Sequence, residues 1–142
     1  YATVGDFSQS VQYADQAVKT NPEDPKLHGN LGVMYYKNNQ MSESIQSLGL
    51  AIHGGSLEGG VAVSGLPLNY GIVAEFYAIY GLALAKSEQC DEAVAIFQAI
   101  RSGVPEDEIN VYNAEQGLII CQQSIGESPP DEVLETEEVE AP

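Results

Sequence analysis

Basic residues are scarce in this chain. Five lysines and arginines stand against 21 aspartates and glutamates, so the 142 residues carry a net charge of −16. A surface with this balance repels a phosphate backbone, which argues against a nucleic-acid-binding protein. Long apolar runs are absent as well, and no stretch approaches the roughly 18 to 20 consecutive apolar residues of a membrane-spanning helix. We therefore expect neither a nucleic-acid partner nor membrane insertion.

The motifs through which proteins commonly hold phosphate, zinc or an activated nucleophile are also missing. The sequence has no glycine-rich phosphate loop, no Cys-x-x-Cys pair, no His-Glu-x-x-His and no Gly-x-Ser-x-Gly. His28 and His53 are expected to be structural or solvated, because a catalytic histidine needs an orienting partner. Asp91 and Glu92 stand where a helix begins, and carboxylates complement the positive end of the helix dipole there. We expect no enzyme, no metal and no cofactor.

Composition divides the chain into a domain and a tail. Hydrophobic residues make up 44% of the sequence, which is typical of a globular domain, and the length suits one such domain. Residues 127–142 differ, because they hold seven acids and no base, and their sizeable apolar residues are Val133, Leu134 and Val139. This composition is typical of disordered segments. We therefore expect a domain over residues 1–126 and an acidic tail over 127–142.

The domain contains a repeat of small and large apolar residues. Residues 25–58 set a pattern that places them on the facing sides of two helices: Leu31-Gly32, Tyr35, Ser44, Leu48 and Ala51. A shift of 34 residues back gives Tyr1, Gly5, Ser10, Ala14, Ala17 and Pro22, and a shift of 49 forward gives Tyr80-Gly81, Leu84, Ala93, Phe97, Ile100 and Pro105. A further shift of 34 gives a first helix alone, with Val111, Ala114 and Leu118 on one face.

This pattern resembles the tetratricopeptide repeat family over about residues 1–124. The resemblance implies an all-α fold, a right-handed superhelical solenoid of antiparallel helix pairs in which the first helix of each pair lines a concave groove. We expect helices near residues 7–20, 25–38, 41–53, 71–86, 90–101 and 107–124. The 15 extra residues between the second and third units form an insertion at about 57–71.

The insertion has two interpretations. Val61 and Val63, then Leu66 and Leu68, alternate around Ser64-Gly65, which is compatible with a short hairpin or a pinned loop. We favour a loop whose leucines cover the edge of the core, and the functional alternative is a lip on the groove.

The two cysteines fall at one end of such a solenoid. Cys90 begins a second helix and Cys121 lies late in the next first helix, so antiparallel stacking should bring them together. A disulfide would then tie the last helix to the body and would indicate an oxidising, extracytoplasmic setting. Two separate buried thiols are the alternative. The first residues lack the basic and apolar regions of a signal peptide, so a cytoplasmic or an already processed chain also stays open.

The resemblance also implies a groove. The inward positions of the first helices in the second and third units are Lys26, Gly29, Val33, Tyr36 and Lys37, then Glu75, Ala78, Leu82, Ala85 and Lys86. Tetratricopeptide adaptors that grip a chaperone's C-terminal carboxylate use a clamp of lysines and asparagines, most of which this surface lacks. An apolar segment or a helix is the more suitable ligand.

The first and last units each resemble half of a repeat. We therefore expect copies of the chain to associate head to tail, and repeated contacts of this kind generate a filament unless the rotation closes. The candidate contact residues are Tyr1, Val4, Phe7, Val11, Val111, Leu118, Val133, Leu134 and Val139.

Three functions remain from the sequence. The first is a structural subunit of an extracellular filament, and the second is an adaptor module that binds an unrelated protein or peptide. The third is an enzyme, for which no constellation of catalytic groups is found.

Overall fold

The computed structural model of the chain describes residues 7–126 and is mostly helical there. The helices are α1 (Ser8–Thr20), α2 (Pro25–Lys37), α3 (Met41–His53), α4 (Ile72–Lys86), α5 (Cys90–Gly103) and α6 (Glu108–Gly126). Their positions confirm the predicted all-α class and the six predicted helices, to within about two residues at each end. Five of the predicted association residues lie outside the described residues: Tyr1, Val4, Val133, Leu134 and Val139.

Local signals set the helix boundaries. The side chain of Asp24 accepts a hydrogen bond of 3.0 Å from the backbone N–H of Lys26, and Pro25 opens α2 where no N–H is needed. The turns that end α2 and α4 each contain a residue with positive φ, Asn39 at 62° and Glu88 at 64°. These two residues lie 49 positions apart, so the repeat found in the sequence is also a repeat of backbone conformation.

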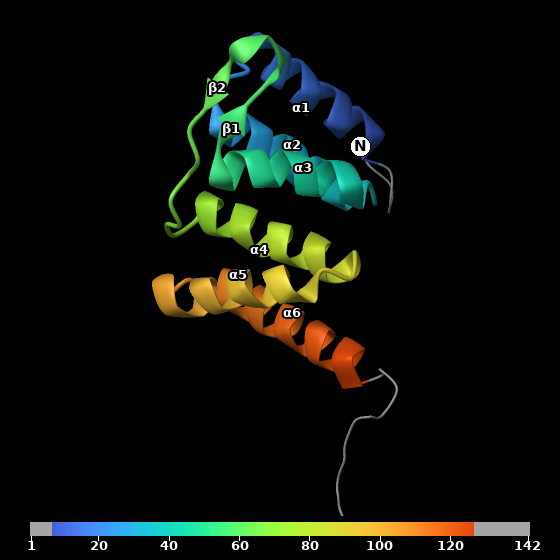
Figure 1. Cartoon of the computed structure of the whole chain (residues 1–142), viewed down its shortest axis with the longest axis vertical. Helices are drawn as coiled ribbons and strands as arrows, with labels where there is room; N and C mark the ends of the chain where they lie inside the picture. Colours follow the sequence, from blue (N-terminus) through green and yellow to red (C-terminus); the bar gives the residue numbers. More distant parts are fainter. Residues whose placement is uncertain (1–6, 127–142) are drawn as a thin grey trace, which may run out of the picture.

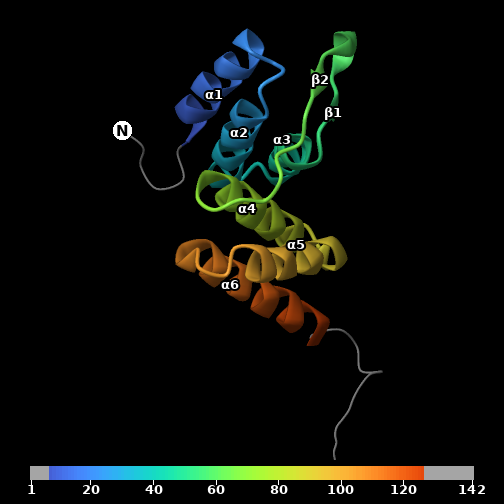
Figure 2. The ribbon, with the colours of Figure 1, turned by 90° about the vertical axis from the view of Figure 1, so that its left-hand side faces the viewer.

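Each helix packs against the next one in the chain. In addition, α4 contacts both α2 and α6. Helices α3 and α5 therefore lie to one side of the stack that α2, α4 and α6 form. Figure 1 shows the helices one below another, and Figure 2 shows α2, α4 and α6 in a column with α3 and α5 displaced to the same side. The first helix, α1, contacts α2 and buries none of its own residues.

The core runs through the stack from α2 to α6. Its largest fully buried side chains include Leu48, Phe76 and Phe97. Glycines allow the close approach: a Cβ added at Gly32 would lie 2.5 Å from Leu48, and one added at Gly81 would lie 2.5 Å from Phe97. The same small-on-large contact therefore recurs 49 residues further on, as the sequence pattern predicts.

The insertion contains a very small hairpin, in a place other than the one predicted. Strand β1 (Gly55–Ser56) pairs antiparallel with β2 (Ala62–Val63), and a 3-10 turn, η1 (Glu58–Gly60), joins them. A hairpin around Ser64-Gly65 is wrong, because Gly65 lies tightly against the backbone at the end of α3 and returns the chain to that helix. Leu66 and Leu68 are partly buried against the core, as in the loop interpretation.

No helix within residues 7–126 is long and apolar enough to cross a membrane.

Candidate functional site

The predicted groove residues divide between surface and core. Lys26, Lys37 and Lys86 are exposed, and Tyr36 is half-buried. Glu75 and Leu82 are half-buried as well. Val33 was expected to line the groove, but it is only 4% exposed and belongs to the core cluster, so it offers no binding surface.

Two lysines of this set lie over aromatic rings. The Lys86 Nζ is 4.8 Å from the centre of the Tyr36 ring, and the Lys37 Nζ is 6.0 Å from that of Phe7. The first contact joins the C-terminal ends of α4 and α2 and brings Tyr36 and Lys86 together. Cation–π contacts of this kind contribute about 0.5–1 kcal/mol at exposed sites.

Neither of these two lysines is neutralised within the described chain. Among residues 7–126, Lys19 forms an ion pair with Asp15 at 3.0 Å, and the His53 ring, which is charged only when protonated, lies 3.9 Å from Glu92. Lys37 and Lys86 therefore have no carboxylate partner among the residues that the structure describes, although the protein as a whole is strongly acidic. Their charges remain available to a ligand.

Helix α6 carries three large exposed apolar side chains of its own. Ile109 is 75% exposed, Tyr112 59% and Ile119 44%. Spacings of three and seven place these side chains on one face of a helix. These residues were not predicted from the sequence, although a signal was present: they follow Glu75, Ala78 and Ala85 by 34 residues each, the shift that relates neighbouring units.

Apolar side chains of α4 and α6 meet at the start of both helices. A depression of about 370 Å³ lies there, and its lining includes Ile72, Ile79, Ile109 and Asn113. Ile72 is 49% exposed, so this end of the surface is open to solvent. We call the whole surface, from Tyr36, Lys37, Leu82 and Lys86 to Ile72, Ile79, Ile109, Tyr112 and Ile119, the α2–α4–α6 face.

A polar clasp fixes the depression. One oxygen of Asp107 accepts a hydrogen bond of 2.8 Å from the backbone N–H of Gly71, and the other accepts from the N–H of Asn110 at 3.4 Å. The buried Asn110 side chain in turn donates to the Gly71 carbonyl. The bond from Gly71, above all, holds the pKa of the Asp107 carboxyl below its ordinary value. The clasp therefore joins the start of α4 to the start of α6.

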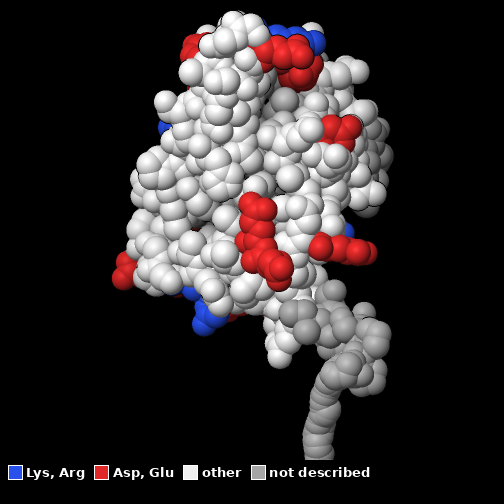
Figure 3. Space-filling view, viewed as in Figure 1, with Lys and Arg blue, Asp and Glu red and all other residues white. Residues whose placement is uncertain are grey.

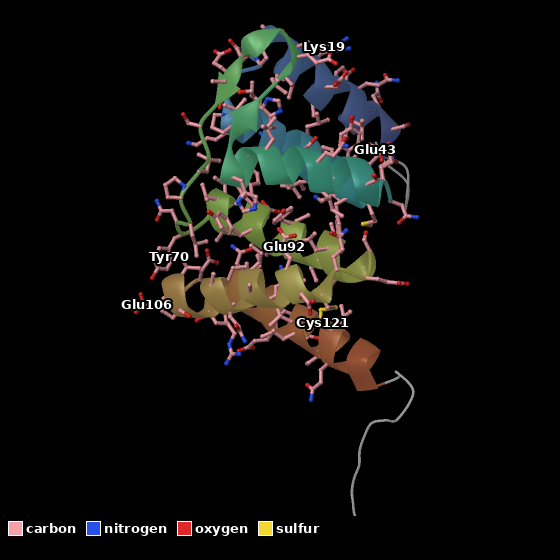
Figure 4. The ribbon with its side chains drawn as sticks, in the orientation of Figure 1. Lys19, Glu43, Tyr70, Glu92, Glu106 and Cys121 are labelled. Carbon is pink, nitrogen blue, oxygen red and sulfur yellow. A yellow bond between two sulfur atoms is a disulfide. The ribbon has the colours of Figure 1, made fainter. Side chains whose placement is uncertain are left out.

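A second polar cluster lies where α3, α4 and α5 meet. The Tyr80 hydroxyl donates a hydrogen bond of 2.9 Å to Glu92 and lies 3.5 Å from the His53 Nε2. Burial, and then the bond to Glu92, raise the pKa of Tyr80 above its ordinary value, so the hydroxyl stays protonated. Figure 4 shows Glu92 between α4 and α5, in the middle of the stack.

This cluster gives His53 the partner that the sequence did not show. Only the packing of three helices brings together residues up to 39 positions apart, and spacing alone carries no signal for it. A protonated tyrosine between a carboxylate and an imidazole can hold three helices in register, but it presents no activated nucleophile. The other histidine, His28, is buried and lies 2.7 Å from the Pro22 carbonyl oxygen through its Nε2. Among residues 7–126 no three metal-ligating side chains come together.

The structure joins Cys90 and Cys121 as a disulfide, with their Cα atoms 5.6 Å apart. Figure 4 shows the sulfur bond at the side of the stack where α5 begins. The bridge connects the start of α5 to the C-terminal half of α6, at the end predicted from antiparallel stacking.

The predicted association residues within the described chain are partly covered. Phe7 and Val11 at the start of α1 are half-buried. Val111 and Leu118 of α6 are also half-buried and pack against the core cluster. Each of them therefore keeps only part of its surface for a contact with another molecule.

Charge is unevenly spread over the molecule. On the side that carries α3 and α5, acidic side chains are scattered over the surface and basic ones lie at its margins (Figure 3). The α2–α4–α6 face combines apolar side chains with Lys37 and Lys86, and it also carries the half-buried Glu75 in the depression and the exposed Glu115 on α6. Within residues 7–126 the fold is thus a stack of helices with a surface that mixes apolar and charged side chains. Comparisons of the chain with protein-family models, with curated proteins and with solved structures give no match.

Proposed function

We propose that the chain is a non-enzymatic protein-interaction scaffold of the tetratricopeptide type, in which the α2–α4–α6 face binds a segment of another protein. Two structural repetitions support the tetratricopeptide assignment. Gly32 on Leu48 recurs as Gly81 on Phe97, and the positive φ of Asn39 recurs at Glu88. A right-handed superhelical solenoid is the architecture that this proposal implies.

The exposed apolar patch on α6 is the observation that carries the proposal. Ile109, Tyr112 and Ile119 are between 44% and 75% exposed, although isoleucine and tyrosine side chains this large gain about 1.5–3 kcal/mol each when they are fully buried. Ile109 and Tyr112 are neighbours one turn apart, whereas the exposed Glu115 and Gln116 stand between Tyr112 and Ile119. Large apolar side chains grouped on an exposed helix face mark interaction sites. An exposed ion pair with Lys37 or Lys86 would add only about 0–1 kcal/mol. Apolar contacts should therefore supply the affinity, and the lysines should select the ligand.

A selection experiment tests this proposal. The full chain, immobilised with its disulfide intact, is used to select peptides from a displayed library, and the best peptide is titrated by calorimetry. The variants Ile109→Asp and Tyr112→Ala should weaken binding by about tenfold or more, because each removes buried apolar area worth over about 1.4 kcal/mol. Tyr13→Ala on α1 is the matched control, since Tyr13 is 64% exposed and lies off the face. Equal losses in all three variants would overturn the proposal.

A second candidate is the head-to-tail association of copies into a filament. The observation that favours it is α1, in which no residue is buried, so that Val11 and its neighbours retain surface for a second copy. In this reading α6 of one molecule, through Val111 and Leu118, would cover α1 of the next. Light scattering across a wide range of protein concentrations tests it, and a mass that stays at that of one chain would rule it out.

For the setting of the protein we propose an extracytoplasmic, oxidising compartment. The disulfide between Cys90 and Cys121 supports this proposal, because such bonds persist where thiols are not kept reduced. Free-thiol titration of protein isolated under thiol-trapping conditions tests it, and two reactive thiols per chain would contradict it.

A further inference from the structure

We infer that the acidic segment 127–142 of the same chain docks on the α2–α4–α6 face at Lys37 and Lys86, so that a protein ligand must displace it. This inference rests on the proposed function and adds a means of regulation to it. The segment lies outside the described residues, so the inference is drawn from its composition and its point of attachment.

The attachment point is close to the two lysines. Consecutive helices of the stack run in opposite directions, so α2, α4 and α6 end on the same side of the molecule (Figure 1). The disulfide places Cys121 of α6 beside Cys90, which follows Lys86 by four residues. Helix α6 ends at Gly126, five residues or about 8 Å beyond Cys121. The segment therefore leaves the fold next to the lysine-bearing edge of the face.

The segment is long enough to cross the face. Packed helices lie about 8–10 Å apart, so the path from α6 past α4 to α2 is on the order of 20 Å. Residues 127–142 span about 50 Å when they are extended. A short tether of this kind gives the segment an effective concentration in the millimolar range at the face, which compensates for weak individual contacts.

The chemistry of the segment matches that of the face. It carries seven acids and no base, with Val133 and Leu134 in the middle of the acidic run. Lys37 and Lys86 have no carboxylate partner among the described residues, and the half-buried Leu82 lies one turn before Lys86 on α4. The carboxylates would therefore meet the two lysines, and Val133 and Leu134 would meet the apolar surface.

Other cations of the body suit the segment less well. Lys19 already pairs with Asp15, and Arg101 lies on α5, a helix that does not contribute to this face. Lys26 lies in the first turn of α2, at the opposite end of that helix from Lys37. The rest of the body is acidic and repels the segment, so the attraction is local and should weaken with salt as the screening length falls from about 8 Å at 0.15 M to about 3 Å at 1 M.

Paramagnetic labelling of the full chain tests the inference directly. A nitroxide attached at Thr136→Cys, with the native disulfide kept oxidised, broadens the amide signals of nearby residues. The signals of Tyr36, Lys37 and Lys86 should lose at least about half their intensity in 0.15 M salt and recover at 1 M salt. The double variant Lys37→Glu/Lys86→Glu should recover them at 0.15 M, whereas Arg101→Glu should leave the broadening in place.

The outcomes separate this inference from the proposed function. Equal recovery in Arg101→Glu would show a general charge effect and overturn the inference. Broadening that appears only when labelled, isotope-free chain is mixed with unlabelled ¹⁵N chain would show contact with a second copy, which also overturns it. If the signals of the face are not broadened, the inference that the segment docks there is overturned. If binding of the selected peptide still depends on Ile109 in the same chain, the scaffold proposal is unaffected.

Discussion

The helix pairs α2–α3 and α4–α5 have the same internal packing and different attachments. In each pair a glycine of the first helix receives a large side chain of the second, Leu48 in one case and Phe97 in the other. The α4–α5 pair is then tied to α6 by a disulfide and by the Asp107 clasp. The α2–α3 pair is capped by α1, which buries no residue. The repeat thus determines the local geometry, while the added bonds determine how firmly each end of the stack is held.

Removal of the disulfide should have the largest effect on this difference. In Cys90→Ser/Cys121→Ser the free energy of unfolding should fall by about 3–4 kcal/mol, because the bridge closes a loop of 31 residues in the unfolded chain. Denaturant unfolding measures the loss, and hydrogen exchange should show that α6 loses more protection than α2 does. Reduction of the wild-type protein should reproduce the effect. A loss below about 1 kcal/mol would mean that α6 is held by packing alone.

Alanine at the two equivalent glycines should give unequal losses. A methyl group in a packed core costs about 1–3 kcal/mol, while alanine gains about 1 kcal/mol over glycine in helix propensity. At Gly32 the nearest atom is the Cγ of Leu48 at 2.5 Å, whose side chain can rotate, and the Leu48 backbone nitrogen follows at 3.0 Å. At Gly81 the clash is with Phe97, whose other edge is held tightly against Gly117 and which therefore cannot move away. Thermal unfolding should show Gly81→Ala as the less stable variant by about 1 kcal/mol, and the reverse order would contradict this account of the core.

The Asp107 clasp should contribute less, and its contribution should depend on pH. Because its folded pKa is lowered, the carboxyl stabilises the fold above its ordinary value of 3.8, and this contribution is lost as pH falls through the lowered value. Asp107→Asn should cost about 1 kcal/mol at neutral pH, the usual loss of a helix-capping carboxylate, and almost nothing in strong acid. Asp91→Asn in the first turn of α5, where no side chain caps the helix, is the control. Equal losses at pH 7 and at pH 2 would argue against the clasp.

The helices and their pairing could be predicted because they depend on local spacing. The glycines at positions 32 and 81, and the apolar residues around them, recur at a fixed shift and need only a helix period to be understood. The disulfide pairing could also be predicted from the sequence, since antiparallel stacking alone brings Cys90 near Cys121. Each of these features is set by one or two helices.

The rest of the site depends on packing among three elements. The exposed apolar residues Ile109, Tyr112 and Ile119 of the fourth unit lie outside its core positions, so the core pattern does not predict them, although the same shift of 34 residues locates them. Val33 was placed in the groove because its helical angle points there, but the neighbouring helix covers it. Gly65 packs against the end of α3, and no feature of the sequence indicates this contact. A hairpin at Ser64-Gly65 could therefore not be excluded from the sequence.

The Tyr80 cluster offers the smallest expected effect and a test at the junction between the two pairs. At neutral pH, Tyr80→Phe removes one hydrogen bond to Glu92, whose side chain is 48% exposed and can bond to water instead, so the loss should be about 0.5–1 kcal/mol. The pKa of Tyr80 is raised, so its stabilising contribution is present below its ordinary value of 10.0 and declines as pH rises above it. The wild-type advantage over Tyr80→Phe should therefore shrink above about pH 10 and then reverse, because unfolding allows the tyrosine to ionise.

Tyr13→Phe on the exposed side of α1 should show neither effect. A wild-type advantage that grows with alkaline pH would mean that the hydroxyl is not held protonated between α4 and α5, and the junction would then depend on apolar packing alone.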